Sequence, residues 1–71
     1  MLLDARGKAW PAPMVMADDA LSRLQEGFIE VLVDNEDASL GLRDLGARKG
    51  FAIVQSREGR DWKVRFERRN Q

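Results

Sequence analysis

The 71-residue sequence contains no cysteine, no histidine and no tyrosine. Without cysteine it has no disulfide, no thiolate nucleophile and no cysteine-ligated zinc site. Without histidine it lacks the usual general base and the commonest transition-metal ligand. The three serines therefore have no imidazole to activate them, and no loop of alternating carboxylates is present to bind calcium or magnesium. We expect a protein that is not an enzyme and that holds no metal or other cofactor.

Long apolar runs are missing as well. No segment approaches the ~20 residues of a membrane span, and the chain does not open with a charged and then apolar signal segment. We therefore expect a cytoplasmic protein that does not contact the membrane. The length fits one domain over residues 1–71, of which residues 68–71 form a polar tail.

The charge is balanced overall but not along the chain. Twelve basic and twelve acidic side chains give a net charge of zero, yet residues 1–46 carry −5 and residues 47–71 carry +5. Such a division makes the molecule an electric dipole that either steers a partner or is neutralised by pairing within the fold.

The first half of the sequence predicts a strand, a helix and a second strand. Residues 2–7 form a short strand that ends at a glycine. After Trp10 and Ala12, which precede prolines and are expected to be extended, apolar residues recur at helical spacing over residues 13–26. Pro13 suits the first turn of this helix, and Gly27 suits its end. Residues 28–34 then form a strand rich in β-branched side chains.

The second half predicts a helix followed by a hairpin. Asp34 or Asn35 caps a helix that ends at Gly50, with two internal glycines that each cost roughly 1 kcal/mol relative to alanine. Residues 51–56 form a strand, residues 57–61 a polar turn, and residues 62–67 a strand that alternates between apolar and charged side chains. The order βαβαββ predicts a two-layer α/β (α+β) sandwich, in which two helices cover one face of a four-stranded mixed sheet.

Four short segments have a familiar order and spacing: Leu3-Asp4-Ala5-Arg6-Gly7, Pro11-x-Pro13, Gly27-x-x-Glu30-Val31-x-Val33-Asp34-Asn35 and Lys49-Gly50-Phe51. Together they resemble the TusA/SirA/YedF family of small sulfur-carrier proteins, over about residues 2–68. The resemblance implies a βαβαββ sandwich similar to the C-terminal domain of translation initiation factor three, which agrees with the fold predicted from the residues alone.

The family's function depends on a Cys-Pro-x-Pro motif. Its cysteine lies just before the first helix, where the positive end of the helix favours a thiolate, and carries a persulfide sulfur between partner proteins. The matching segment here is Trp10-Pro11-Ala12-Pro13, and Lys8 stands where the family usually has an apolar residue. The resemblance therefore implies that Trp10 replaces the sulfur-bearing cysteine and that sulfur transfer does not carry over.

The motif region offers candidate partner-binding residues: Arg6, Lys8, Trp10, Pro11 and Pro13. Trp10 either packs over the start of the helix as a structural residue or anchors a partner as an exposed aromatic. Arg6 and Lys8 either form an anion pocket with the backbone N–H groups after Trp10, or Arg6 pairs with Asp4 or another carboxylate and does nothing more.

Two further surfaces are candidates for binding. Phe28 and Leu32 are expected on the sheet face away from the helices, either as an apolar docking patch or as ordinary surface residues. Lys63, Arg65 and Arg68 lead a basic surface on the final hairpin, joined by Arg57, Arg60 and Arg69. That surface is either a solvated strand face, interrupted by acidic residues, or a site for nucleic acid.

The preferred hypothesis is a non-catalytic domain with a protein-binding or regulatory role linked to sulfur or selenium metabolism. Its partner would be a protein, with sulfur-relay proteins as the first candidates, and the chain itself would be a monomer or a weak homodimer. The alternative is a small RNA- or nucleic-acid-binding module that uses the basic hairpin.

Overall fold

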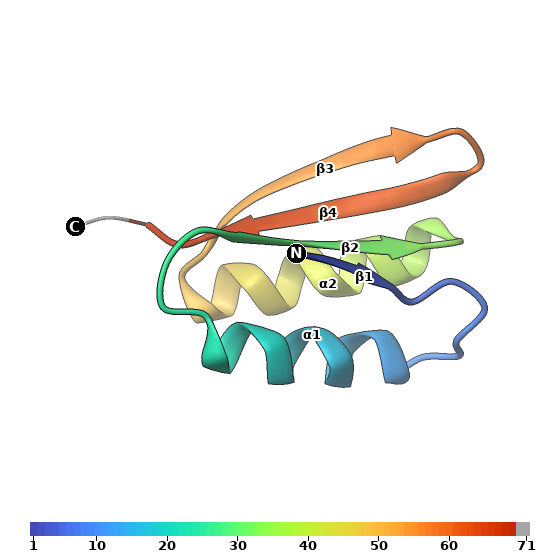
Figure 1. The fold of residues 1–71 in the computed structure, drawn as a ribbon. Helices are drawn as coiled ribbons and strands as arrows, with labels where there is room; N and C mark the ends of the chain where they lie inside the picture. Colours follow the sequence, from blue (N-terminus) through green and yellow to red (C-terminus); the bar gives the residue numbers. More distant parts are fainter. Residues whose placement is uncertain (70–71) are drawn as a thin grey trace.

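The computed structural model, which describes residues 1–69, contains the predicted six elements in the predicted order. They are β1 (Leu2–Asp4), α1 (Ala12–Arg23), β2 (Phe28–Val33), α2 (Glu36–Lys49), β3 (Ala52–Glu58) and β4 (Asp61–Glu67). Both helices lie on one face of a four-stranded sheet, as Figure 1 shows. The predicted two-layer sandwich is confirmed.

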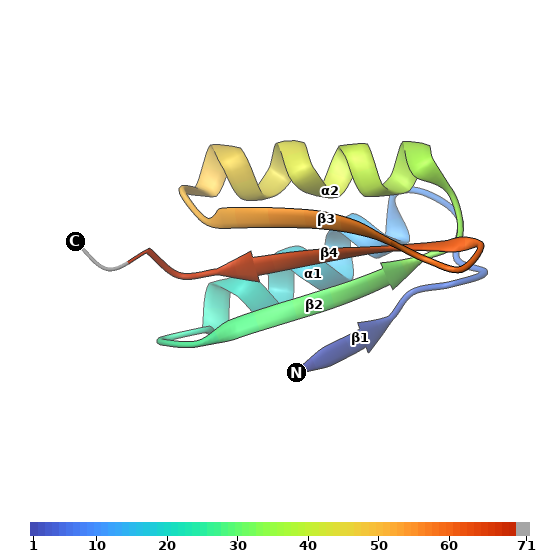
Figure 2. The ribbon, with the colours of Figure 1, turned by 90° about the horizontal axis from the view of Figure 1, so that it is seen from above.

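The sheet is mixed, with the strands in the order β1-β2-β4-β3. β1 runs parallel to β2 because α1 carries the chain back between them, whereas β4 is antiparallel to both of its neighbours. β4 thus lies between β2 and β3, and β1 and β3 form the two edges. α1 packs on β2, and α2 packs on β3 and β4, side by side in Figure 2.

The core lies between the sheet and the helices. Alternate residues of a strand point to opposite faces, and Ile29, Val31 and Val33 are buried on the face opposite Phe28 and Leu32. The buried residues that meet them come from β4 and from one stripe on each helix: Val64, Phe66, Ala17, Leu21, Leu42 and Leu45. Neither helix in this part of the chain has the length and apolar character that a membrane crossing requires.

The bounds of α1 differ from the prediction at both ends. Ala12 is helical rather than extended, because its N–H donates to the carbonyl of Ala9 (2.9 Å) in the turn that starts the helix. The helix stops at Arg23 instead of residue 26, since Leu24 is already extended and its carbonyl accepts a hydrogen bond from Nε of Arg68. Residues 24–27 therefore form the turn into β2, where Gly27 has φ +89°.

α2 begins and ends where the sequence predicts. Oδ1 of Asn35 accepts the N–H of Ala38 (2.8 Å), Glu36 and Asp37 lie in the positive first turn, and Gly50 closes the helix with φ +84°. Five strand bounds shift: β1 ends at Asp4 rather than residue 7, β2 ends at Val33 rather than residue 34, β3 spans Ala52–Glu58 rather than residues 51–56, and β4 starts at Asp61. The hairpin turn is thereby shorter than the predicted residues 57–61. Residues 70 and 71 of the predicted tail lie outside the described residues.

Gly46 allows α2 to approach the sheet closely. A Cβ atom at this position would lie 2.7 Å from the ring of Phe66 and 2.9 Å from Cδ1 of Ile53. Phe66 is fully buried in the core, so its ring can move away only by displacing neighbouring core side chains. The internal glycine that looks costly for the helix is therefore required by its packing.

Replacing Gly46 with alanine tests this constraint. The extra methyl group should cost about 1–3 kcal/mol by overpacking, which exceeds the gain of about 1 kcal/mol in helix propensity. We expect Gly46→Ala to lower the free energy of unfolding, measured by urea denaturation. Ala47→Gly on the exposed side of the same helix measures the propensity effect alone. A Gly46→Ala protein as stable as the parent would contradict the packing argument.

Candidate functional site

The loop between β1 and α1 holds the motif residues at one end of the molecule. Pro11 is the N-cap residue of α1, and Pro13 is buried within the first helical turn. The Trp10–Pro11 peptide bond is cis. Because both prolines have a fixed φ, the backbone that carries Trp10 into the helix has little freedom.

The Trp10 indole lies against the backbone of α2 at Gly41. A Cβ atom at Gly41 would be 2.5 Å from Cη2 and 2.8 Å from Cζ2 of the indole. This contact leaves the Trp10 residue 47% exposed. One part of the indole thus packs on α2 rather than over the start of α1, where the sequence predicted it, and the rest is exposed. The anchoring of a partner stays a prediction.

A cleft of about 450 Å³ opens beside the indole. One wall is the loop of Lys8, Ala9 and Trp10, and the other is the first two turns of α2. The α2 wall consists of Asn35, Asp37, Ala38 and Gly41. The cleft combines an aromatic surface with a lysine on one side and a carboxylate on the other.

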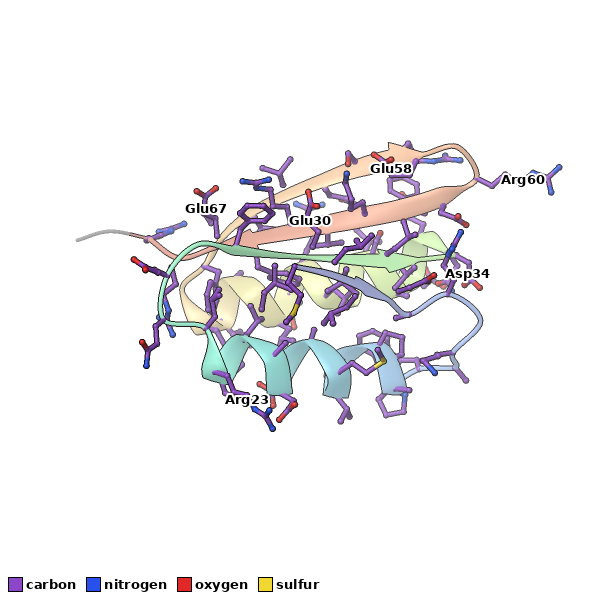
Figure 3. The ribbon with its side chains drawn as sticks, viewed as in Figure 1. Arg23, Glu30, Asp34, Glu58, Arg60 and Glu67 are labelled. Atoms are coloured by element: carbon purple, nitrogen blue, oxygen red, sulfur yellow. The ribbon has the colours of Figure 1, made fainter. Side chains whose placement is uncertain are left out.

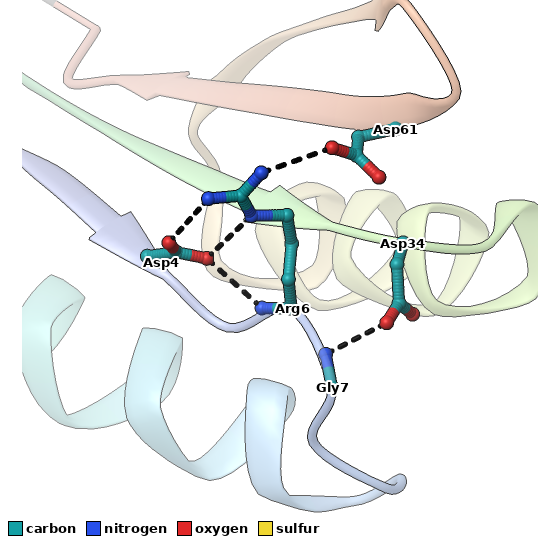
Figure 4. Close-up of polar contacts among 5 residues, drawn as sticks. All are labelled: Asp4, Arg6, Gly7, Asp34 and Asp61. Carbon is teal, nitrogen blue, oxygen red and sulfur yellow. Dashed lines mark hydrogen bonds and ion pairs between the residues drawn. The ribbon is translucent and has the colours of Figure 1, made fainter.

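Arg6 belongs to a separate polar cluster, shown in Figure 4. Its Nε and Nη2 donate to the two carboxylate oxygens of Asp4 (2.9 and 2.8 Å), and its Nη1 donates to Asp61 on β4 (3.2 Å). Beside this group, Asp34 accepts the backbone N–H of Gly7 (2.7 Å). These bonds hold the loop against the ends of β2 and β4.

The hydrogen bonds of this cluster shift the pKa values of Asp4, Arg6 and Asp34. Those from Arg6 lower the pKa of Asp4 to about 2, and the two carboxylates raise the pKa of Arg6 above its usual value. The bond from Gly7, followed by one from the side chain of Asn35, lowers the pKa of Asp34. Asp4 and Arg6 therefore form an ion pair across the physiological pH range. Pairing of Arg6 with a carboxylate is the second of the two alternatives predicted from the sequence.

The donors needed for an anion pocket at the start of α1 are mostly occupied. Pro11 and Pro13 have no N–H group, and the N–H groups of Ala12 and Val15 donate to Ala9 and Pro11. Arg6 is held by Asp4 and Asp61. Lys8 thus lines the cleft with Trp10 and also lines the hollow in which Arg6 lies among the carboxylates of Asp4, Asp34 and Asp61.

Phe28 and Leu32 lie on the sheet face away from the helices, but Glu30 separates them along β2. The guanidinium of Arg65 lies 3.6 Å from the centre of the Phe28 ring, which leaves Phe28 36% exposed. Leu32 is half-buried. Figure 3 shows Glu30 and Glu67 projecting from this face, so the apolar surface here is small and divided by charged side chains.

Four basic side chains in and beside the hairpin contact acidic or aromatic neighbours. Lys63 lies 3.7 Å from Glu30 and 3.5 Å from Glu58, and Arg65 lies 3.6 Å from both Glu30 and Glu67. Arg57 stacks over Trp62, and Arg68 over Phe51. Arg60 projects from the hairpin turn in Figure 3. Carboxylates therefore balance the charges of Lys63 and Arg65, whereas Arg57 and Arg68 pack on aromatic rings and keep their charge.

Some residues of the cleft were not predicted from the sequence. Gly41 is one of the two internal glycines expected to weaken the helix, Asn35 was expected only as a cap, and Asp37 was not singled out as a site residue. An internal helical glycine was the one available signal, since glycine often marks a close approach of another group. Within residues 1–69, no group of three or more acidic side chains is arranged to hold a metal ion.

Fold and site together define a small α/β sandwich domain whose first helix opens on a Pro-x-Pro segment. The family model described as sulfurtransferase TusA matches residues 1–68. A crystal structure of a SirA-like protein from Desulfitobacterium hafniense superposes with a TM-score of 0.86 at 28% sequence identity, over 93% of each chain. A search of curated proteins gave no match. The chain belongs to the TusA family, and the resemblance seen in its motifs is confirmed.

The contact between Trp10 and Gly41 can be tested by fluorescence. In a Trp62→Phe background, where Trp10 is the only indole, Gly41→Ala should displace the ring into solvent. We expect emission at longer wavelength and stronger quenching by iodide. The free energy of unfolding should change by less than about 1 kcal/mol, because helix propensity offsets the lost packing. Ala47→Ser on another side of α2 is the control, and unchanged Trp10 emission in Gly41→Ala would contradict the contact.

The Asp4–Arg6 pair predicts a specific loss of stability in acid. Because folding lowers the pKa of Asp4 from its ordinary 3.8 to about 2, its stabilising contribution is complete above about pH 4 and disappears as pH falls through 2. In Asp4→Asn the free energy of unfolding should therefore fall less steeply between about pH 4 and about pH 2 than it does in the parent. Asp19→Asn, which removes an exposed pair with Arg23 on α1, should change this slope much less. Equal slopes for Asp4→Asn and the parent would refute the assignment.

Proposed function

We propose that this TusA-family domain binds a protein partner through the Trp10 surface and does not itself carry sulfur. A persulfide carrier needs a thiolate that attacks a donor persulfide, and the sequence has no cysteine. By resemblance to the family motif, Trp10 occupies the position of the sulfur-bearing cysteine. An indole forms no persulfide, so the domain is assigned no catalytic residue.

The observation that carries the proposal is the half-exposed indole fixed on Gly41. Tryptophan is the residue type most enriched among binding hot spots, and a side chain already held in place loses little conformational entropy when a partner binds. The adjoining cleft adds Lys8 and Asp37 at its rim, where polar groups orient a partner. The site therefore has the composition of a small protein-docking surface.

The family suggests which partners to examine first. TusA-family carriers exchange sulfur with relay proteins, which must recognise the surface around the start of the first helix. A domain that keeps this surface but lacks the thiol would occupy the docking site of such a protein without receiving sulfur. That behaviour corresponds to a regulatory role in sulfur or selenium metabolism.

The alternative, binding of nucleic acid by the hairpin, has weaker support. Phosphate binding requires basic groups that can exchange their counterions for the polymer. Lys63 and Arg65 instead lie near Glu30, Glu58 and Glu67. Binding there would first have to separate these pairs.

The proposal is tested by measuring binding to purified cysteine desulfurases and sulfur-relay proteins from the same source organism. At least one should bind the parent domain. Trp10→Ala should weaken that binding about 30-fold, since truncating a hot spot costs ~2 kcal/mol or more. Val54→Ala, which truncates an exposed apolar residue on the open sheet face, is the matched control. An affinity that is the same for Trp10→Ala as for the parent, or no binding to any of these proteins, would refute the proposal.

A Trp10→Cys variant separates loss of the thiol from loss of the docking surface. In the expected reaction the introduced thiolate attacks the outer sulfur of the desulfurase persulfide, forms a new S–S bond and releases the desulfurase thiolate. Mass spectrometry should then show the addition of one sulfur atom, removed by a reducing agent. If a desulfurase binds this variant but transfers no sulfur, the docking geometry differs from that of a carrier.

A further inference from the structure

The outer edge of β3 is an unprotected strand edge. Within residues 1–69, β4 is the only strand that pairs with β3, and their register from Ala52↔Glu67 to Glu58↔Asp61 contains no bulge. Residues 52–56 contain no proline and no charge, and the two charged residues of the strand, Arg57 and Glu58, lie at its end. Natural edges usually carry such protection against pairing with another chain. The opposite edge, β1, is only three residues long.

One stripe of α2 lies along the same edge. Leu40, Arg43, Asp44 and Ala47 follow one another at helical spacing and, with Ile53 of β3, line a groove of about 310 Å³. Leu40 is 44% exposed although it is a large apolar residue. Figure 2 shows α2 running beside β3, so a strand added to this edge would also meet the stripe.

The middle of the α2 stripe lies beside the middle of β3. Nη1 of Arg43 donates to Oε1 of Gln55 (2.9 Å), and Gln55 is the central residue of β3. A two-fold axis near this contact would therefore pair β3 with β3 of a second copy, and the α2 stripe with the same stripe of that copy. Gln55 would face Gln55 of the other copy, and the antiparallel helix stripes would place Leu40 opposite Ala47 and Arg43 opposite Asp44.

We propose that the β3 edge and this α2 stripe form an interface with a second copy of the chain. The pairing is self-complementary, as a two-fold interface requires: strand backbone meets strand backbone, apolar meets apolar, and each Arg43 meets an Asp44. Arg43 has five N–H donors and uses one on Gln55, so it can also bind a carboxylate. The product is one continuous eight-stranded sheet with four helices on the same face.

This interface is distinct from the Trp10 cleft and does not depend on the proposed function. It is also distinct from a dimer through Phe28 and Leu32, which would join two open sheet faces. Only pairing at β3 would protect β3 amides from hydrogen exchange as the protein concentration rises. The β1 amides at the other edge should show no such change.

Sedimentation velocity between ~10 µM and ~1 mM, a range suited to a small and weak interface, tests the proposal. The mean mass should rise toward twice the 8.1 kDa of one chain. Arg43→Asp and Asp44→Arg each place like charges across the axis twice and should each weaken association by ~10-fold or more. An equimolar mixture of the two variants restores opposite charges at both contacts and should recover the association.

Arg23→Asp on α1, which reverses an exposed arginine away from this edge, should leave association unchanged. Circular dichroism of each variant checks that it is folded. A chain that stays monomeric at ~1 mM overturns the proposal. So does association that survives both charge reversals, or association without concentration-dependent protection of β3. A monomer whose β3 edge is protected only by adding an unrelated extended peptide would assign the edge to a different occupant.

Discussion

The missing side chain at Gly46 sets the distance between α2 and the sheet, and most of the molecule depends on that distance. Phe66, at the centre of the core, is in direct contact with the helix only because no methyl group intervenes. A small domain has few such contacts and therefore a small free energy of unfolding. Ile53, which lies against the same glycine, also lines the groove beside β3. The shape of that groove therefore depends on how closely α2 approaches the sheet.

Features controlled by neighbouring residues were predictable from the sequence. Pro13 in the first turn of α1, Asn35 as the N-cap of α2 and Gly50 at its end act through their own backbone geometry. The alternation of Ile29, Val31 and Val33 likewise identified the buried face of β2. Because these signals are local, the order of elements and the fold class followed from them.

Features controlled by distant residues were not predictable in the same way. α1 ends early, with the carbonyl of Leu24 bonded to Arg68, 44 positions along the chain. Arg6 bonds to Asp61 across 55 positions, and Trp10 lies on a glycine of the second helix. Opposite charges in the two halves predicted that some pairing would occur, and Lys49 with Asp18 and Arg65 with Glu30 are examples. No sequence pattern specified which partners would meet, since that depends on the assembled sheet.

The contact between Trp10 and Gly41 also couples two positions that lie far apart in the chain. An indole in this orientation has no room beside any side chain larger than hydrogen at position 41. A substitution at 41 must therefore move the ring, and a smaller side chain at position 10 would uncover the backbone of α2 at Gly41. The two residues act as one unit that seats the loop on α2, although no pattern in the sequence links them.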